Sequence, residues 1–124
     1  MKFAEITGKI IAAAMKVHRE LGPGFQEYIY QRALEIELHN NSLHYKKEYE
    51  MPVYYSGEKI GLRIVDFFIE EKIMTELKAV SELTDVHLAQ ALNYLEASGT
   101  EIGLLINFGA KSLQFKRLHN KKFG

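Results

Sequence analysis

The first third of the chain carries two stretches in which apolar residues recur every three or four positions. Charged residues separate the apolar positions, and in the first stretch this pattern predicts an amphipathic helix of about five turns over residues 3–21. The Gly-Pro-Gly sequence at 22–24 ends this helix, because glycine accepts a left-handed conformation and proline cannot continue the hydrogen-bond pattern. A second helix is expected from near Phe25 to about His39, where two asparagines and a serine stop it.

From Leu43 onward the apolar period changes to two, which is typical of β-strands. Pro52 lies inside the first of these stretches and restricts it to a sheet edge or a bulge, since proline cannot donate to a ladder. Three consecutive strands, forming a hairpin or meander, are expected at residues 45–55, 60–69 and 73–79, with turns at 56–58 and 70–72.

A third helix and two further strands complete the pattern. Thr84 can cap a helix that runs to about Ala97, with leucines as its core stripe. The segment 102–108 is strongly apolar, which suits a strand covered on both faces, and 112–118 is a more polar last strand. The order ααβββαββ predicts one α/β domain over residues 1–124, with a mixed sheet of four to five strands flanked by helices.

Composition narrows the class of protein. A chain of 124 residues has room for one core, and its apolar fraction of 47% is that of a globular protein. The absence of cysteine excludes disulfides and thiolate metal sites, and it fits a reducing, cytoplasmic location. No apolar run is long enough to span a membrane, so neither a membrane protein nor a secreted one is expected.

The charge is balanced overall but unevenly distributed. There are 16 Lys and Arg against 16 Asp and Glu, which by itself counts against a nucleic-acid partner. After Glu101, however, the chain has no acidic residue. The basic residues that follow, together with three earlier ones, can form a phosphate-contacting strip: Lys111, Lys116, Arg117, Lys121 and Lys122, with Lys46, Lys47 and Arg63. The alternative is a solvated tail with no partner.

The segment with the clearest chemistry spans the second and third expected strands. If their turn centres on Glu71, Asp66 lies directly opposite Glu76, with Cβ atoms about 4.5–5.5 Å apart. Lys78 then shares their face, alongside apolar residues such as Ile64. A tighter two-residue turn would shift the register by one and place the two carboxylates on opposite faces, so the register is a testable premise.

Opposed carboxylates repel each other unless a positive charge lies between them, and a divalent cation supplies one. Mg²⁺ or Mn²⁺ takes one or two carboxylates plus waters, with the carbonyl of Leu77 as a further candidate ligand. Lys78 can then orient or deprotonate an attacking water and stabilise charge on a phosphorus atom. The alternative is a cross-strand ion-pair cluster on a solvated sheet face.

Residues on two of the helices support the first interpretation. Glu27 lies in the first turn of the second helix, where its plain role is a favourable contact with the helix dipole. Gln90 and Tyr94 are four apart on the third helix and form, with His87, a polar strip distinct from the leucines. Solvent exposure explains that strip equally simply, but a helix packing back on the sheet would bring Gln90 toward the carboxylates.

The segment from Gly24 to Tyr30 spells G-x-x-E-x-x-Y, and the sequence resembles the GxxExxY family, a branch of the PD-(D/E)xK nuclease superfamily. The similarity extends over nearly the whole chain. Its other segments are Val17–Gly24, the strand of Asp66, Glu76–Ala79, Gln90–Tyr94 and Gly103–Gly109.

The resemblance implies a restriction-endonuclease-like core of helix, three-stranded meander, helix and strand, with the active site on the meander. By position, Asp66 and Glu76 resemble the acidic metal ligands and Lys78 the motif lysine. Glu27 is similar to the helical glutamate that supplements the metal, and Gln90 with Tyr94 to a Q-x-x-x-Y motif. The family pattern has proline where this chain has Val65.

The resulting expectation is a Mg²⁺- or Mn²⁺-dependent nuclease that hydrolyses phosphodiester bonds, with DNA favoured over RNA. A protein partner that supplies specificity is also expected, because so short a chain leaves little surface for recognising a substrate, and the apolar strand and the Pro52 edge leave room for a homodimer. The alternative function is an inactive nuclease-fold module that binds nucleic acid or a protein partner.

Overall fold

The computed structural model describes residues 2–124. Within them the elements follow the predicted order: α1 (Ala4–Leu21), α2 (Glu27–Asn40), β1 (Tyr45–Tyr55), β2 (Glu58–Ile69), β3 (Ile73–Lys78), α3 (Asp85–Ala97), β4 (Ile102–Asn107), β5 (Gln114–His119) and a short 3₁₀ helix, η1 (Lys121–Phe123). The expected cap of α3 is confirmed, since the Thr84 side chain accepts from the amide of His87. None of the described helices is both long and apolar enough to cross a membrane.

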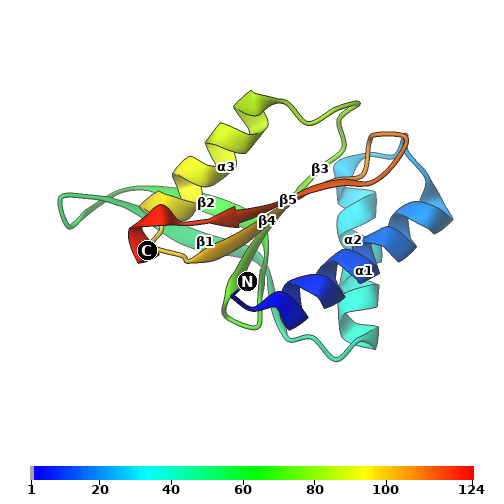
Figure 1. Cartoon of the computed structure of the whole chain (residues 1–124), viewed down its shortest axis with the longest axis horizontal. Coiled ribbons are helices and arrows are strands. Elements are labelled where there is room, and N and C mark those ends of the chain that lie inside the picture. Colours follow the sequence, from blue (N-terminus) through cyan, green and yellow to red (C-terminus); the bar gives the residue numbers. More distant parts are fainter. Residues whose placement is uncertain (1) are drawn as a thin grey trace.

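The five strands form one mixed sheet in the order β1-β2-β3-β4-β5. Only β3 and β4 are parallel, and α3 makes the crossover that a parallel pair requires. In Figure 1, α3 lies on one side of the sheet, and α1 and α2 lie on the other. The prediction of a mixed α/β architecture is therefore confirmed.

Two hydrophobic clusters fill the spaces between the sheet and its helices. One joins α1 and α2 to sheet residues such as Phe67, Leu77 and Ile106. The other joins α3 to residues such as Val65 and Met74. Every residue of β4 is buried, as expected for a strand covered on both faces.

The register of β2 and β3 is the one that centres on Glu71. The ladder pairs Ile69 with Ile73 and Phe67 with Thr75, and its turn closes through a hydrogen bond from the Lys72 amide to the Ile69 carbonyl, 3.0 Å long. Pairing stops at Phe67 and Thr75, so Asp66 and Glu76 lie just beyond the last rung. This open end of the ladder positions the candidate chemistry.

The β1–β2 ladder changes faces beside Asp66. It pairs Lys47 with Phe67 and Tyr49 with Val65, and it skips Glu48 and Asp66 between them. Glu48 has a φ of 50°, a left-handed conformation inside a strand. Regular alternation would put Val65 and Phe67 on one face, but Val65 packs with α3 and Phe67 with α1 and α2.

This change of face in β2 alters which residues neighbour the site. Arg63, two residues before Val65, now shares the face of α3. Ile64, which was expected beside the carboxylates, is 57% exposed instead. The change of face itself places Asp66 where its side chain contacts both α2 and β3.

Candidate active site

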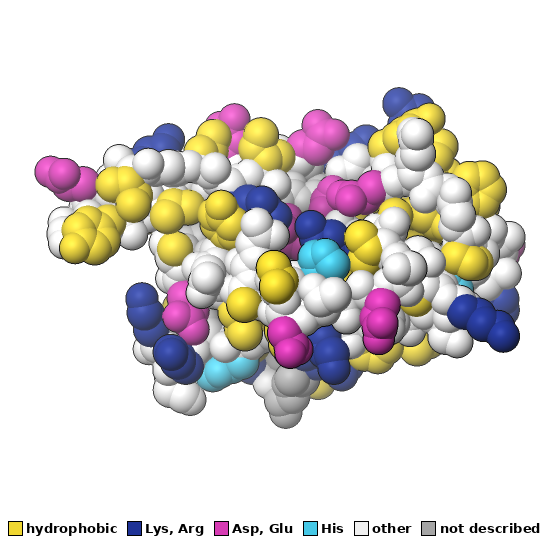
Figure 2. Space-filling model, turned by 90° about the horizontal axis from the view of Figure 1, so that it is seen from above, with side chains coloured by type: hydrophobic (Ala, Val, Ile, Leu, Met, Phe, Trp, Pro, Cys, Tyr) yellow, Lys and Arg dark blue, Asp and Glu magenta, His cyan; other side chains and the backbone are white. Residues whose placement is uncertain are grey.

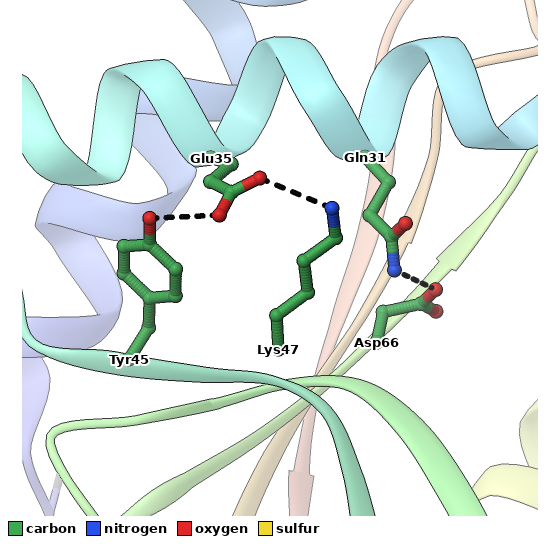
Figure 3. Close-up of polar contacts among 5 residues, drawn as sticks. All are labelled: Gln31, Glu35, Tyr45, Lys47 and Asp66. Atoms are coloured by element: carbon green, nitrogen blue, oxygen red, sulfur yellow. Dashed lines mark hydrogen bonds and ion pairs between the residues drawn. The ribbon is translucent and has the colours of Figure 1, made fainter.

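Asp66 is bound through both carboxylate oxygens. Its Oδ2 accepts a hydrogen bond from the Leu77 amide at 2.8 Å, and its Oδ1 accepts one from Nε2 of Gln31 at 3.1 Å. Figure 3 shows Gln31 reaching down from α2 to this carboxylate. The side chain thus takes the place of a missing rung between β2 and β3, which fixes the direction in which the carboxylate points.

The surroundings of Asp66 raise its pKa to about 6, mainly because burial disfavours the charged form. The carboxylates of Glu27 and Glu76 add to the rise, while the Leu77 amide and the Lys78 ammonium oppose it. The pKa of Glu27 is raised as well, first by burial, with Lys78 opposing and Glu76 adding. Three carboxylates and Lys78 therefore lie within electrostatic reach of one another.

Glu76 is the most enclosed of these carboxylates, with 6% of its side chain exposed. It forms an ion pair with Nη2 of Arg63, and the Arg63 guanidinium lies 4.5 Å from the centre of the Tyr94 ring on α3. Sequence analysis had placed Arg63 only in a general basic strip. The structure instead places it in the site, between the acidic strand and the third helix.

A fixed loop presents Glu27, the first residue of α2. The Tyr30 hydroxyl donates to the Gly22 carbonyl at 2.6 Å and accepts from the Phe25 amide at 3.2 Å. Its ring is fully buried and stacks on Phe108, with ring centres 4.8 Å apart. The tyrosine of the G-x-x-E-x-x-Y motif thus anchors the loop that leads to the glutamate.

The exit of β3 is held as firmly, and this fixes the position of Lys78. Buried Asn107 accepts from the Val80 amide and donates to the Val80 carbonyl, both at 2.9 Å. A Cβ added to Gly109 would lie 2.4 Å from that carbonyl oxygen, so only glycine allows the close approach. The Phe108 amide also donates to the Lys78 carbonyl at 2.9 Å.

One face of α2 continues the polar site along the sheet. Glu35, four residues after Gln31, accepts from the Tyr45 hydroxyl at 2.9 Å and from Nζ of Lys47 at 3.2 Å (Figure 3). Burial opposes the change, but these hydrogen bonds lower the pKa of Glu35. Residues 27, 31 and 35 are spaced by four, so helical periodicity from Glu27 was the signal that could have identified Gln31.

The Q-x-x-x-Y residues occupy different environments. Tyr94 is half-buried against Arg63. Gln90 is exposed and lines a shallow hollow with Val86, Ala89, Asn93 and Tyr94. His87 takes part in the cap of α3 through its contact with Thr84. A role for Gln90 in the site therefore stays a prediction.

The basic residues do not form one free strip. Lys46 pairs with Glu71 at 2.9 Å and Lys47 pairs with Glu35. On β5, Arg117 points to Thr7 of α1, whereas its neighbour Leu118 packs in the cluster with α3. Figure 2 shows acidic and basic side chains side by side near the middle of one face, and hydrophobic side chains at the end where Figure 1 places the β1–β2 hairpin.

The donor set fits a hard divalent cation in its chemistry. Asp66, Glu76 and Glu27 offer carboxylate oxygens, and burial followed by the neighbouring carboxylates raises the pKa of Asp66 and of Glu27, which a bound cation would oppose. Across residues 2–124, however, no three His, Asp or Glu side chains converge tightly enough to form a ready cation site. The engaged atom of Leu77 is its amide, and its carbonyl as a ligand stays a prediction.

The chain was compared with protein families, curated proteins and solved structures. A family model described as the PD-(D/E)XK nuclease superfamily matches residues 4–118. Searches of curated proteins and of solved structures found no match to this chain. The matched range includes all the residues that converge on Asp66.

Proposed function

Since this chain belongs to the PD-(D/E)XK nuclease superfamily, we propose that it is a divalent-metal-dependent nuclease that hydrolyses phosphodiester bonds in nucleic acids. The observation that carries the proposal is the convergence of Asp66, Glu76 and Lys78 at the open end of the β2–β3 ladder. Residues 1–124 act in this proposal as a single nuclease-like domain of the GxxExxY branch. The G-x-x-E-x-x-Y motif supports that branch, because its tyrosine anchors the loop that presents Glu27.

Asp66 and Glu76 are the proposed metal ligands, with Glu27 and the Leu77 carbonyl as supplementary ones. Mg²⁺ commonly binds through one or two carboxylates and keeps several waters, so two nearby acids are sufficient. Mn²⁺ accepts the same oxygen donors. Both oxygens of Asp66 are already oriented by hydrogen bonds, which limits the reorganisation that binding requires.

In the proposed reaction, water attacks the phosphorus and the P–O bond to the departing sugar oxygen breaks. Asp66 and Glu76 would hold Mg²⁺ or Mn²⁺, which when bound would lower the pKa of a water and offset phosphate charge. Lys78 orients or deprotonates the attacking water and stabilises the added negative charge on phosphorus. Tyr94 holds Arg63 by stacking, and Gln90, one turn earlier on α3, is proposed to contact the substrate.

The proposed substrate is DNA, favoured over RNA. A direct test incubates both nucleic acids with Mn²⁺ and the wild type, Asp66→Ala or Lys78→Ala. Both variants should lose at least about 100-fold in rate, as removal of a positioned catalytic group does. Lys72→Ala, in the exposed β2–β3 turn, is the matched control and should cleave like the wild type. Equal cleavage by all four proteins would show that another site, or a contaminant, is responsible.

A specific observation favours the second candidate, an inactive module that binds nucleic acid or a protein. The Arg63 ion pair already neutralises Glu76, as in a structural cluster. Calorimetry separates the two functions. Salt-sensitive DNA binding without any heat from Mg²⁺ or Mn²⁺ would support the module, whereas metal binding that Asp66→Ala abolishes would support the nuclease.

A second copy of the chain is the proposed protein partner, through the β1–β2 hairpin. Its outer part carries uncovered apolar side chains, with Ile60, Leu62 and Ile64 exposed by 65%, 44% and 57%. Tyr54 and Tyr55 at the tip of the hairpin are also exposed, by 51% and 71%, and clustered exposed apolar side chains of this kind are typical of interaction sites. Two copies of one such surface bury each other symmetrically, as in most homodimers.

A further inference from the structure

The Arg63 guanidinium lies beside Glu76, where the proposed metal ion would otherwise bind. Its Nη2 pairs with the glutamate, and only 6% of the Glu76 side chain is exposed. A buried carboxylate is costly without a positive partner, and Arg63 supplies that partner in the absence of metal. A divalent cation at the same carboxylate would compete with the guanidinium, because two positive groups a few ångströms apart repel each other.

The other contacts of Arg63 leave it able to change partners. The guanidinium stacks on Tyr94, a contact that holds its plane against α3 without using any N–H donor. Its Nε is buried and, in the part of the chain that the structure describes, has no hydrogen-bond partner. Buried donors left unsatisfied are rare in folded proteins, so an acceptor is missing here.

We infer that Arg63 substitutes for the metal at Glu76 in the metal-free protein, and that metal binding releases it to bind the phosphate of the substrate. This inference rests on the proposed nuclease function. It adds to that function a residue, Arg63, that exchanges the Glu76 carboxylate for the substrate phosphate. A guanidinium presents its N–H donors in a fork that matches phosphate oxygens, and Nε is one of them. The phosphate then becomes the missing acceptor, and Arg63 touches the substrate as a catalytic residue.

The inference makes metal affinity and activity change in opposite directions. In Arg63→Met, Glu76 has no competing cation, so calorimetry should show Mn²⁺ binding about tenfold tighter than in the wild type. Cleavage at saturating Mn²⁺ should nevertheless fall at least about tenfold, because the phosphate contact is gone. A purely structural ion pair predicts otherwise, since its loss would disorder the site and weaken both.

Two further measurements keep the test decisive if Arg63→Met folds poorly. Arg63→Gln removes the charge but can still donate to Glu76, and it should also bind Mn²⁺ more tightly than the wild type. In the wild type, the ¹⁵N signal of the Arg63 Nε should shift when Mg²⁺ is added, and Glu76→Gln should abolish the shift. Unchanged or weaker Mn²⁺ binding in the folded variants, or a static Arg63 signal, would overturn the inference. If the wild type binds no metal at all, it is the proposed function that fails.

Discussion

At the scale of single residues, the acids of the site are held in an unfavourable state. Asp66 is largely buried near two other carboxylates, and its pKa of about 6 means that folding without a cation favours the protonated form. Hydrogen bonds from the Leu77 amide and the Gln31 side chain hold the Asp66 carboxylate in this position. Such strain at a functional site is expected when a ligand is to relieve it.

The raised pKa of Asp66 predicts a pH dependence of stability in EDTA. The unfolded group titrates near its ordinary value of 3.8 and the folded one near 6, so the native state binds more protons between them. Its contribution to the free energy of unfolding is therefore highest below pH 4. It falls by about 3 kcal/mol as pH rises to just above 6, at about 1.4 kcal/mol per pKa unit.

Asp66→Asn lacks this titration but keeps an acceptor for the Leu77 amide. Denaturant unfolding at pH 4.5 and 7.5 should show that the variant gains stability relative to the wild type as pH rises. Glu20→Gln, at the exposed end of α1, removes the same charge and should show no such gain. A constant difference between Asp66→Asn and the wild type would contradict the pKa assignment.

At the scale of elements, the position of Lys78 is determined by its pairing with Asn107 at the end of β3 and by close backbone packing just beyond it. Just after β3, the backbone of Val80 packs closely against Gly109. The Asn107 side chain forms a hydrogen bond with the Val80 amide. The lysine side chain is therefore carried on a segment that cannot shift without breaking these contacts. This is the arrangement that a catalytic group needs, since small displacements of such groups cost large factors in rate.

Two glycine substitutions separate this packing from ordinary helix propensity. Gly109→Ala should lower the free energy of unfolding by about 1–3 kcal/mol, because its Cβ would lie 2.4 Å from the Val80 carbonyl oxygen. Gly8→Ala, inside α1 with no atom within 4 Å of the added Cβ, should raise it by about 0.5–1 kcal/mol. Thermal unfolding of both variants checks the pair, and similar effects of the two substitutions would exclude the proposed clash.

At the scale of the whole molecule, local patterns predicted the architecture and long-range contacts completed the site. Helical and alternating periods identified the elements, and the turn centred on Glu71 gave the observed β2–β3 register. The change of face in the β1–β2 ladder at Glu48 could not be predicted. Glutamate is not typical of left-handed positions, and no local sequence feature indicates the change. Arg63 therefore entered the site only through the fold, whereas Gln31, four residues after Glu27 on α2, could have been identified from helical periodicity.

The outer part of the β1–β2 hairpin gives the molecule a face that its own helices do not cover. Edge strand β1 also carries Lys46, Lys47 and Pro52, which disfavour edge-to-edge pairing. Packing of one hairpin face against another is therefore the arrangement expected for two copies.

Replacing Leu62 by Glu tests that arrangement. The wild type should sediment as a dimer, and Leu62→Glu should be monomeric, because a charge introduced into the apolar contact would be buried without a partner. Ile36→Glu is the matched control, since Ile36 is 60% exposed on α2, outside the hairpin, and its replacement should leave the dimer intact. Retained nuclease activity per chain in the Leu62→Glu monomer would show that the partner is not part of the active site. A monomeric wild type, or dimers of equal stability in all three proteins, would rule out the hairpin contact.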